Sequence, residues 1–170
     1  LSDVLQLAVQ MGETETSYTA RSYLGRLFRD EGDQEKAQQV LTSVLEFGLV
    51  NWQDRPLQIY NTMLELGSVY QAKGLLAEAE ATFEEAWLGL LETVGESHPS
   101  TLVAMNNLGQ IYEKEGLYDL AEPILKQALS DMESVLGADN PQASRARNNL
   151  ALLHESQGNF REAEPLYQRS

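Results

Sequence analysis

The stretch that decides the fold is residues 99–137, which reads PSTLVAMNNLGQIYEKEGLYDLAEPILKQALSDMESVLG. Its first half carries apolar side chains at helical spacing from Leu102 to Tyr112. Its second half repeats that spacing from Tyr118 to Val135. An apolar stripe of this kind is typical of a helix that buries one face. The stretch therefore predicts two helices joined by a short turn, which makes them an antiparallel pair.

Proline and glycine mark the expected ends of these helices. Pro99 and Pro141 suit the first helical position, where the missing N–H would have had no partner. Asn140 adds a side chain that is favoured as a helix cap. Gly116 and Gly137 stand where the residue that follows a helix adopts a left-handed conformation. We therefore expect each unit to begin at a proline and to be divided by a glycine.

The same pattern recurs with a period of 42 residues. Four columns keep this offset without slippage: Leu24, Leu66, Leu108 and Leu150; Phe28, Tyr70, Tyr112 and His154; Gly32, Gly74, Gly116 and Gly158; and Ala37, Ala79, Ala121 and Ala163. A fixed period of this length indicates units stacked on their neighbours, which offer an extended surface for binding. No segment shows the sustained alternation of a strand, so an all-α fold is expected.

Small residues occupy the middle of three expected first helices, at Gly67, Gly109 and Ala151. Glycine inside a helix costs about 1 kcal/mol relative to alanine. A helix retains such a residue where another backbone must come close. We expect small residues of the second helices to face them, namely Ala79, Ala121 and Ala163.

The composition excludes several classes of function. Lys and Arg number 12 against 26 Asp and Glu, which gives a net charge of −14. This balance argues against non-specific binding to nucleic acid and against docking on an anionic membrane. We interpret the acidity as a source of solubility, with a preference for basic partners as the alternative. The absence of cysteine excludes disulfides and thiolate metal sites, and a cytoplasmic location is expected.

Two sets of residues carry a resemblance to a known family. They are Met63, Leu66, Gly67, Tyr70, Ala79, Phe83 and Ala86, and, one period later, Met105, Leu108, Gly109, Tyr112, Ala121, Leu125 and Ala128. In this order they resemble the tetratricopeptide repeat. The first copy departs from the pattern at Val44 and the last reaches Ser170, where alanine is usual in both cases. The resemblance implies a right-handed superhelical solenoid of stacked antiparallel helix pairs.

The usual period of this family is 34 residues, so the period of 42 adds about two helical turns. We expect the addition to lengthen the second helix and its connection to the next unit. Segments such as 106–109 (NNLG) and 163–167 (AEPLY) are similar to the longer repeats of kinesin light chain. The expected repeats are residues 18–51, 60–93, 102–135 and 144–170, the last one truncated. Residues 1–12 are interpreted as the end of a preceding second helix, and residues 1–170 as one solenoid fragment of a longer chain.

The resemblance also implies where a partner binds, because in this family the first helices line the concave face of the array. First-helix side chains outside the apolar stripe are therefore the candidate contacts with a protein or peptide. They are Tyr23, Arg26, Arg29, Asn61, Gln71, Asn106, Asn107, Gln110, Arg145, Asn148 and Asn149.

The paired asparagines 106–107 and 148–149 are unusual because asparagine is a middling helix former. An amide side chain donates and accepts, so it can bind the backbone of an extended peptide. It can equally tie neighbouring repeats together. Both interpretations remain open, and different members of a pair can serve different roles.

Four arginines lie on first helices: Arg26, Arg29, Arg145 and Arg147. Since many glutamates fall on the second helices, the groove should be less acidic than the back. This arrangement favours an acidic or C-terminal carboxylate peptide as the ligand. The alternative is internal pairing with Asp30, Glu31 and Glu155. Arg147 replaces the methionine of the central copies and is expected near the edge of the array.

No constellation of catalytic residues is recognisable. His98 precedes a helix-starting proline and His154 replaces a packing tyrosine, so structural roles are expected for both. We therefore predict an interaction module without enzymatic activity, cofactor or metal, which binds a peptide or a partner domain. The alternatives are a regulatory segment of a larger enzyme or transcription factor, and a scaffold that self-associates end to end.

Overall fold

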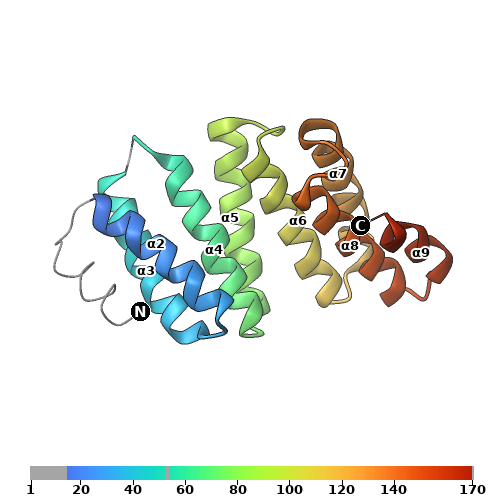
Figure 1. Ribbon diagram of the computed structural model, residues 1–170, viewed down its shortest axis with the longest axis horizontal. Helices are drawn as coiled ribbons and strands as arrows, with labels where there is room; N and C mark the ends of the chain where they lie inside the picture. Colours follow the sequence, from blue (N-terminus) through green and yellow to red (C-terminus); the bar gives the residue numbers. More distant parts are fainter. Residues whose placement is uncertain (1–14, 53, 170) are drawn as a thin grey trace. The chain divides into compact units, whose positions relative to one another are not determined.

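The computed structural model describes residues 15–52 and 54–169 (Figure 1). This part of the chain forms helices joined by short connections and contains no strand. The helices are α2 (Glu15–Asp30), α3 (Gln34–Asn51), α4 (Pro56–Ala72), α5 (Leu76–Val94), α6 (Pro99–Lys114), α7 (Tyr118–Leu136), α8 (Pro141–Ser156) and α9 (Phe160–Gln168). The helix end expected at residues 1–12 lies outside the described residues.

The chain divides into two compact units, residues 1–82 and 83–170, and the boundary falls within α5. In the first unit α2 packs on α3 and α3 packs on α4. The core between them contains Leu24, Phe28, Leu41 and Val69, all nearly or fully buried. Each helix contributes its apolar stripe to this core, as the helical spacing predicts.

A second, aromatic cluster closes one end of the first unit. The rings of Tyr18 and Phe47 stack with their centroids 3.6 Å apart, and Trp52 meets both rings edge-on. The indole can fold back on α3 because Gly48 has no side chain: a Cβ there would lie 2.7 Å from Cε3 of Trp52. Gly48 therefore fixes the direction in which the chain leaves α3.

In the second unit α6 pairs with α7, α8 packs on both, and α9 packs on α8. Its core combines small and large side chains, among them Leu102, Leu125, Met132, Ala146 and Leu153. Ala146 and Leu153 of α8 are fully buried in it. One helix pair thus buries its open face under the first helix of the next, as a stacked repeat requires.

The predicted helix ends in the second unit are confirmed. Nδ1 of His98 accepts a hydrogen bond from the Ser100 backbone N–H at 3.1 Å, so this histidine is a helix cap. Asn140 accepts from the Gln142 N–H in the same way at 2.8 Å. Gly116 has a φ of 76° and Gly137 a φ of 92°, the left-handed region that favours glycine.

The mid-helix glycines do permit close packing, but leucine and not alanine is the nearest neighbour. A Cβ on Gly109 would lie 2.8 Å from both Cγ and Cδ2 of Leu125. In the first unit Gly25 meets Leu41 in the same way, at 2.6 Å. The expected partner, Ala121, is fully buried one turn earlier on the same helix. The isobutyl group of Leu125 occupies the space that a side chain on Gly109 would fill.

We expect Gly109→Ala to lower the melting temperature, because Leu125 must move to admit the methyl group. Overpacking of this kind costs about 1 to 3 kcal/mol, which exceeds the gain in helix propensity of at most about 1 kcal/mol. The matched control is Ala151→Gly at the equivalent position of α8, where a buried methyl group and helix propensity are lost but nothing is overpacked. A rise in the melting temperature of Gly109→Ala, measured by circular dichroism, would contradict the packing argument.

Arg147 was expected near the edge of the array instead of in the groove, and the structure shows that its side chain is buried, with only 2% exposed. Its guanidinium forms an ion pair with Glu133 of α7 and donates to the backbone carbonyl oxygens of Ala138, at 3.0 Å, and Arg169. The long side chain can thus replace methionine because it reaches polar partners at the ends of α7 and α9. Arg147 is a structural residue of the second unit.

A pair of substitutions separates volume from charge at this position. Arg147→Ala leaves a cavity and unpaired carbonyl groups, so we expect a loss of about 2 to 4 kcal/mol in the free energy of unfolding. Arg147→Met restores the residue of the central repeats, and buried ion pairs are often replaced by apolar side chains at little cost. We expect this variant to lie within about 1 kcal/mol of the wild type. Equal losses in the two variants, measured by urea unfolding, would refute this interpretation.

Candidate functional site

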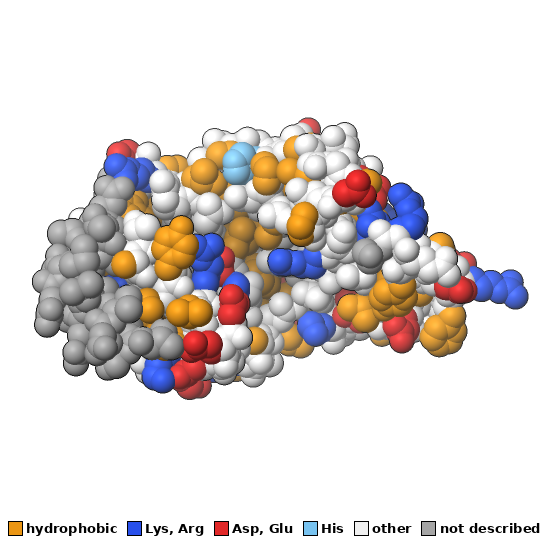
Figure 2. Space-filling view, viewed as in Figure 1, with side chains coloured by type: hydrophobic (Ala, Val, Ile, Leu, Met, Phe, Trp, Pro, Cys, Tyr) orange, Lys and Arg blue, Asp and Glu red, His pale blue; other side chains and the backbone are white. Residues whose placement is uncertain are grey.

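A cavity of about 380 Å³ opens in the first unit between α2, α4 and the connection that precedes α4. Its described lining consists of Thr19, Ser22, Tyr23, Arg26, Leu41, Trp52, Arg55, Gln58, Asn61, Thr62 and Glu65. Three of the predicted contact residues, Tyr23, Arg26 and Asn61, therefore meet in one place. Figure 2 shows hydrophobic and basic side chains next to each other over α2 and α4. We call this feature the α2–α4 cavity.

Tyr23 and Arg26 form one wall of the α2–α4 cavity. They lie one helical turn apart on α2, and the guanidinium carbon of Arg26 is 4.6 Å from the centroid of the Tyr23 ring. The ring is 64% exposed. Among the described residues Arg26 has no carboxylate partner within ion-pair distance. The ring supports one face of the guanidinium, and the N–H groups in its plane can bind a carboxylate.

Two residues of the opposite wall, Trp52 and Arg55, were not predicted. Both lie in the connection from α3 to α4, within the segment that exceeds a 34-residue period. Trp52 is 8% exposed and contributes its indole to the floor of the cavity. Arg55 lies directly before Pro56, the first residue of α4. In the sequence, Gly48 and Trp52 are the residues that indicate that this connection folds back on the repeat.

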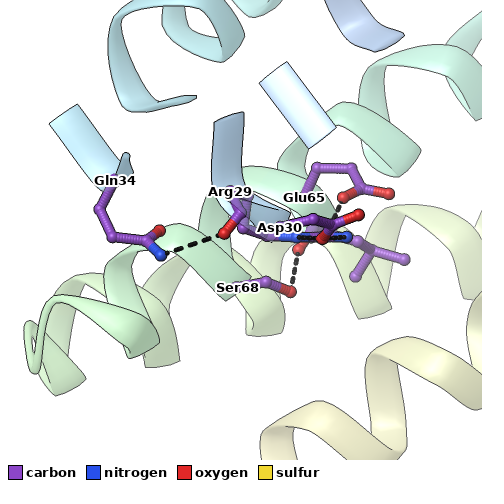
Figure 3. A network of polar contacts seen from close by, with 6 residues as sticks. Arg29, Asp30, Gln34, Glu65 and Ser68 are labelled. Carbon is purple, nitrogen blue, oxygen red and sulfur yellow. Dashed lines mark hydrogen bonds and ion pairs between the residues drawn. The ribbon is translucent and has the colours of Figure 1, made fainter. Parts of the chain in front are cut away.

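Arg29 is engaged within the first unit, which supports the internal-pairing alternative for this residue. It forms ion pairs with Asp30, at 2.9 Å, and with Glu65 of α4 (Figure 3). Its backbone carbonyl oxygen also accepts a hydrogen bond from Gln34 at 3.3 Å. The pair with Glu65 joins the first helices of two successive repeats. It also neutralises the one carboxylate in the described lining of the α2–α4 cavity.

In the second unit the asparagines form a ladder between α6 and α8. Nδ2 of Asn149 donates to Oδ1 of Asn106 at 3.2 Å, and Oδ1 of Asn149 accepts from Nε2 of Gln110 at 3.1 Å. Asn106 and Asn149 are 2% and 5% exposed. These amides tie one repeat to the next, so the structural interpretation holds for Asn106 and Asn149. A buried amide pair of this kind also specifies the register of the two helices.

The remaining candidates lie apart from this ladder and from the α2–α4 cavity. Asn107 is buried on α6, and Asn148 is half-buried on α8. Arg145 is exposed on α8, whereas Gln71 is half-buried near the end of α4. The structure therefore brings together Tyr23, Arg26 and Asn61 in one place, and Asn106, Gln110 and Asn149 in another.

We expect Asn149→Ala to cost about 1 to 3 kcal/mol of stability, because it leaves the amide of Asn106 buried without its partner. Asn148→Ala is the matched control: its side chain has no hydrogen bond among the described residues. A surface change of this kind should stay within about 0.5 kcal/mol of the wild type. Thermal unfolding of both variants measures the difference, and equal melting temperatures would show that the ladder is not stabilising.

The outer side of α8 and α9 carries a second, open hollow of about 490 Å³. Phe160 and Tyr167 are 66% and 40% exposed there. The hydroxyl of Tyr167 donates to Glu155 at 2.7 Å. Partial burial, and next this hydrogen bond, raise the pKa of Tyr167 to about 12. The phenol therefore stays neutral over the physiological range and holds α9 against α8.

The described residues contain no group of His and acidic side chains that could hold a metal ion. None of the helices in residues 15–52 and 54–169 has the length and apolar character needed to cross a membrane. His154, at the position of a packing tyrosine, is 7% exposed on α8, as expected for a structural role.

Comparisons with known proteins agree with the geometry. A family model described as tetratricopeptide repeat matches residues 58–134 and 103–170. The chain is similar to BtubC (BKLC) from P. vanneervenii, at 21% identity and a TM-score of 0.81 over 99% of this chain and 68% of that chain. It is also similar to a putative kinesin light chain of P. anserina with nearly identical repeats, at 20% identity and a TM-score of 0.76 over 99% and 80% of the two chains.

A third similar structure is a Rap protein in complex with Competence and Sporulation Factor. It shares 18% identity and a TM-score of 0.65 over 97% of this chain and 54% of that chain. No curated protein matches the chain. The solved structures confirm the predicted all-α fold of repeated helix pairs, and the putative kinesin light chain among them confirms the similarity to kinesin light chain repeats.

Proposed function

Because the chain belongs to the tetratricopeptide repeat family, we propose that it is a non-enzymatic module that binds a partner protein through an extended peptide segment. The observation that carries this proposal is the α2–α4 cavity, where exposed Tyr23 and Asn61 and half-buried Arg26 line a single opening. A pocket with an aromatic floor and a few polar groups is the usual form of a peptide-binding site. The binding face is that of the first helices, which we expect to be concave.

The chemistry of the first-helix face supports a peptide more than a rigid partner surface. Gln58 and Asn61 present amides about one helical turn apart on α4, where they can pair with peptide N–H and C=O groups in an extended conformation. Tyr23 offers a large contact area with little conformational entropy to lose. The Rap structure supports a binding role for this fold, because it was solved with a bound factor.

The proposal can be tested without a known partner by selecting binders from a randomised peptide library. The selected peptide, labelled with a fluorophore, gives a dissociation constant by fluorescence polarisation. We expect Tyr23→Ala and Asn61→Ala each to weaken binding about tenfold, the usual effect of removing a central contact. The controls are Gln39→Ala and Glu46→Ala, which change exposed side chains of α3, the second helix of the same pair.

Equal effects of the α3 controls and of the cavity variants would refute the proposed binding face. The failure of any peptide to be enriched would refute the peptide-binding function itself. Circular dichroism of each variant shows whether its helices are intact.

A further inference from the structure

We infer that the outer side of α9 is a second binding surface, which holds an amphipathic helix of a partner protein with a neutral hydrogen-bond donor at its C-terminal end. The surface is the open hollow of about 490 Å³ described above. Its described lining consists of Glu155, Phe160, Ala163, Glu164, Tyr167 and Gln168. We call this feature the α9 face. The inference does not depend on the α2–α4 cavity.

The apolar side chains of the α9 face lie in columns of the repeat that are buried one period earlier. Ala163 and Tyr167 correspond to Ala121 and Leu125 of α7, and both of these are fully buried. Tyr167, in contrast, is 40% exposed. α7 packs on α6 and on α8, whereas α9 lies beside α8 (Figure 1). Since stacked repeats bury their faces on one another, the α9 face suits the apolar stripe of one more helix.

Two junctions between a second helix and the helix that follows it show how the covering helix is held at its C-terminal end. In the first unit Nζ of Lys73, the residue that caps α4, donates to Oε1 of Gln38 on α3 at 2.6 Å. In the second unit Nε2 of Gln157, which caps α8, donates to Oε2 of Glu122 on α7 at 3.4 Å. Lys73 and Gln157 share one column of the repeat, and Gln38 and Glu122 share another. Both junctions thus use a contact between the same two columns.

Glu164 presents the acceptor of this contact on the α9 face. It lies one period after Glu122, and its side chain is exposed. It accepts a hydrogen bond from Gln168, one turn later on the same helix, at 3.2 Å. A carboxylate has about four acceptor sites, so it can accept from a second helix as well.

Glu155 presents a second acceptor beside the first. It lies one period after Glu113, which accepts from the hydroxyl of Ser156 at 2.6 Å and so links α6 to α8. The hydroxyl of Tyr167 bonds to one of the two carboxylate oxygens of Glu155. α8 therefore supplies two consecutive donors, Ser156 and Gln157, to the acceptor columns that recur on the α9 face.

The charges near Glu164 favour an amide over a lysine as the donor. At the first junction Lys73 also pairs with Glu35 at 2.8 Å. The column of Glu35 holds Arg161 on α9, one turn before Glu164. A lysine on the covering helix would therefore meet an arginine, whereas a neutral amide would not be repelled. The occupant should thus resemble α8, which is capped by Gln157, more than α4.

The same columns argue against a second copy of this chain as the occupant. In end-to-end stacking, α2 of one copy would lie on α9 of another, in the place of a following first helix. The two donor columns hold Asp30 and Glu31 in the first repeat, and both side chains are exposed. These acids would lie opposite Glu155 and Glu164, where like charges repel. We therefore assign the α9 face to a partner protein.

The probe is a synthetic peptide of residues 141–157, the sequence of α8 and its cap, held helical by a hydrocarbon staple on its polar side and labelled with a fluorophore. Fluorescence polarisation measures its dissociation constant for the whole protein. We expect it to bind, and Phe160→Ala to weaken the binding about tenfold because an exposed aromatic contact is lost. A peptide with Gln157→Glu should bind about fivefold more weakly, since its carboxylate meets Glu164.

An exchange of charges locates the contact. Glu164→Lys should restore the binding of the Gln157→Glu peptide, whereas Glu162→Lys, the same change at an exposed position outside the lining, should not. Arg161→Glu should increase the affinity of a Gln157→Lys peptide about fivefold. Tyr23→Ala, which tests the α2–α4 cavity, should leave these affinities unchanged. Circular dichroism must show the same melting temperature for each variant as for the wild type within a few degrees.

Each remaining outcome overturns the inference. Binding that is unchanged in Phe160→Ala, with no recovery of the Gln157→Glu peptide in Glu164→Lys, would show that the peptide displaces α8 from its own place. Absence of binding up to about 1 mM would show that the α9 face holds no such helix. In sedimentation velocity, a dimer that dissociates in Phe160→Ala would place a second copy there. Loss of peptide binding in a form of the chain that extends beyond Ser170 would place a segment of the same chain there.

Discussion

The contact on which each unit depends is the one between a leucine of the second helix and a residue without a side chain on the first. Leu41 lies against Gly25, and Leu125 lies against Gly109, at distances that leave no room for a Cβ. Because the two helices of a pair approach so closely, most residues of their apolar stripes are buried against one another. The open face of the pair can then accept the first helix of the next pair. The packing of the other helices in each unit depends on this close contact between the two helices of a pair.

This constraint separates two kinds of polar side chain on the first helices. Those between successive first helices are buried or half-buried and hydrogen-bond to each other, as Asn106, Gln110 and Asn149 do. Those outside this contact reach solvent, Tyr23 largely and Arg26 in part. Arg29 and Glu65 perform in the first unit the bridging that amides perform in the second. The ion pair in the first unit and the amide ladder in the second thus both link successive first helices, through different residues.

Much of the fold could be predicted from the sequence because it depends on residues that recur. The helix pairs, the caps at His98 and Asn140, and the left-handed glycines are all properties of the 42-residue period. The partner of Gly109 was predicted one turn away, because helical spacing gives the face of a side chain but not its reach. The burial of Arg147 was not predicted, for a related reason: the position alone does not show that Glu133 and two carbonyl groups lie within reach of its guanidinium.

The candidate site could be predicted only in part, because half of it lies outside the repeated columns. Tyr23, Arg26 and Asn61 follow from their places on first helices, whereas Trp52 and Arg55 occupy a connection whose path depends on Gly48. Within the α3–α4 connection, the residues that lengthen the repeat beyond 34 therefore do more than space the helices: they supply one wall of a cavity. Arg55 in this wall corresponds to Asp139 two periods later, so the sign of the charge differs between the two connections. A longer connection can therefore give one junction its own binding chemistry while the packing columns of the repeat remain unchanged.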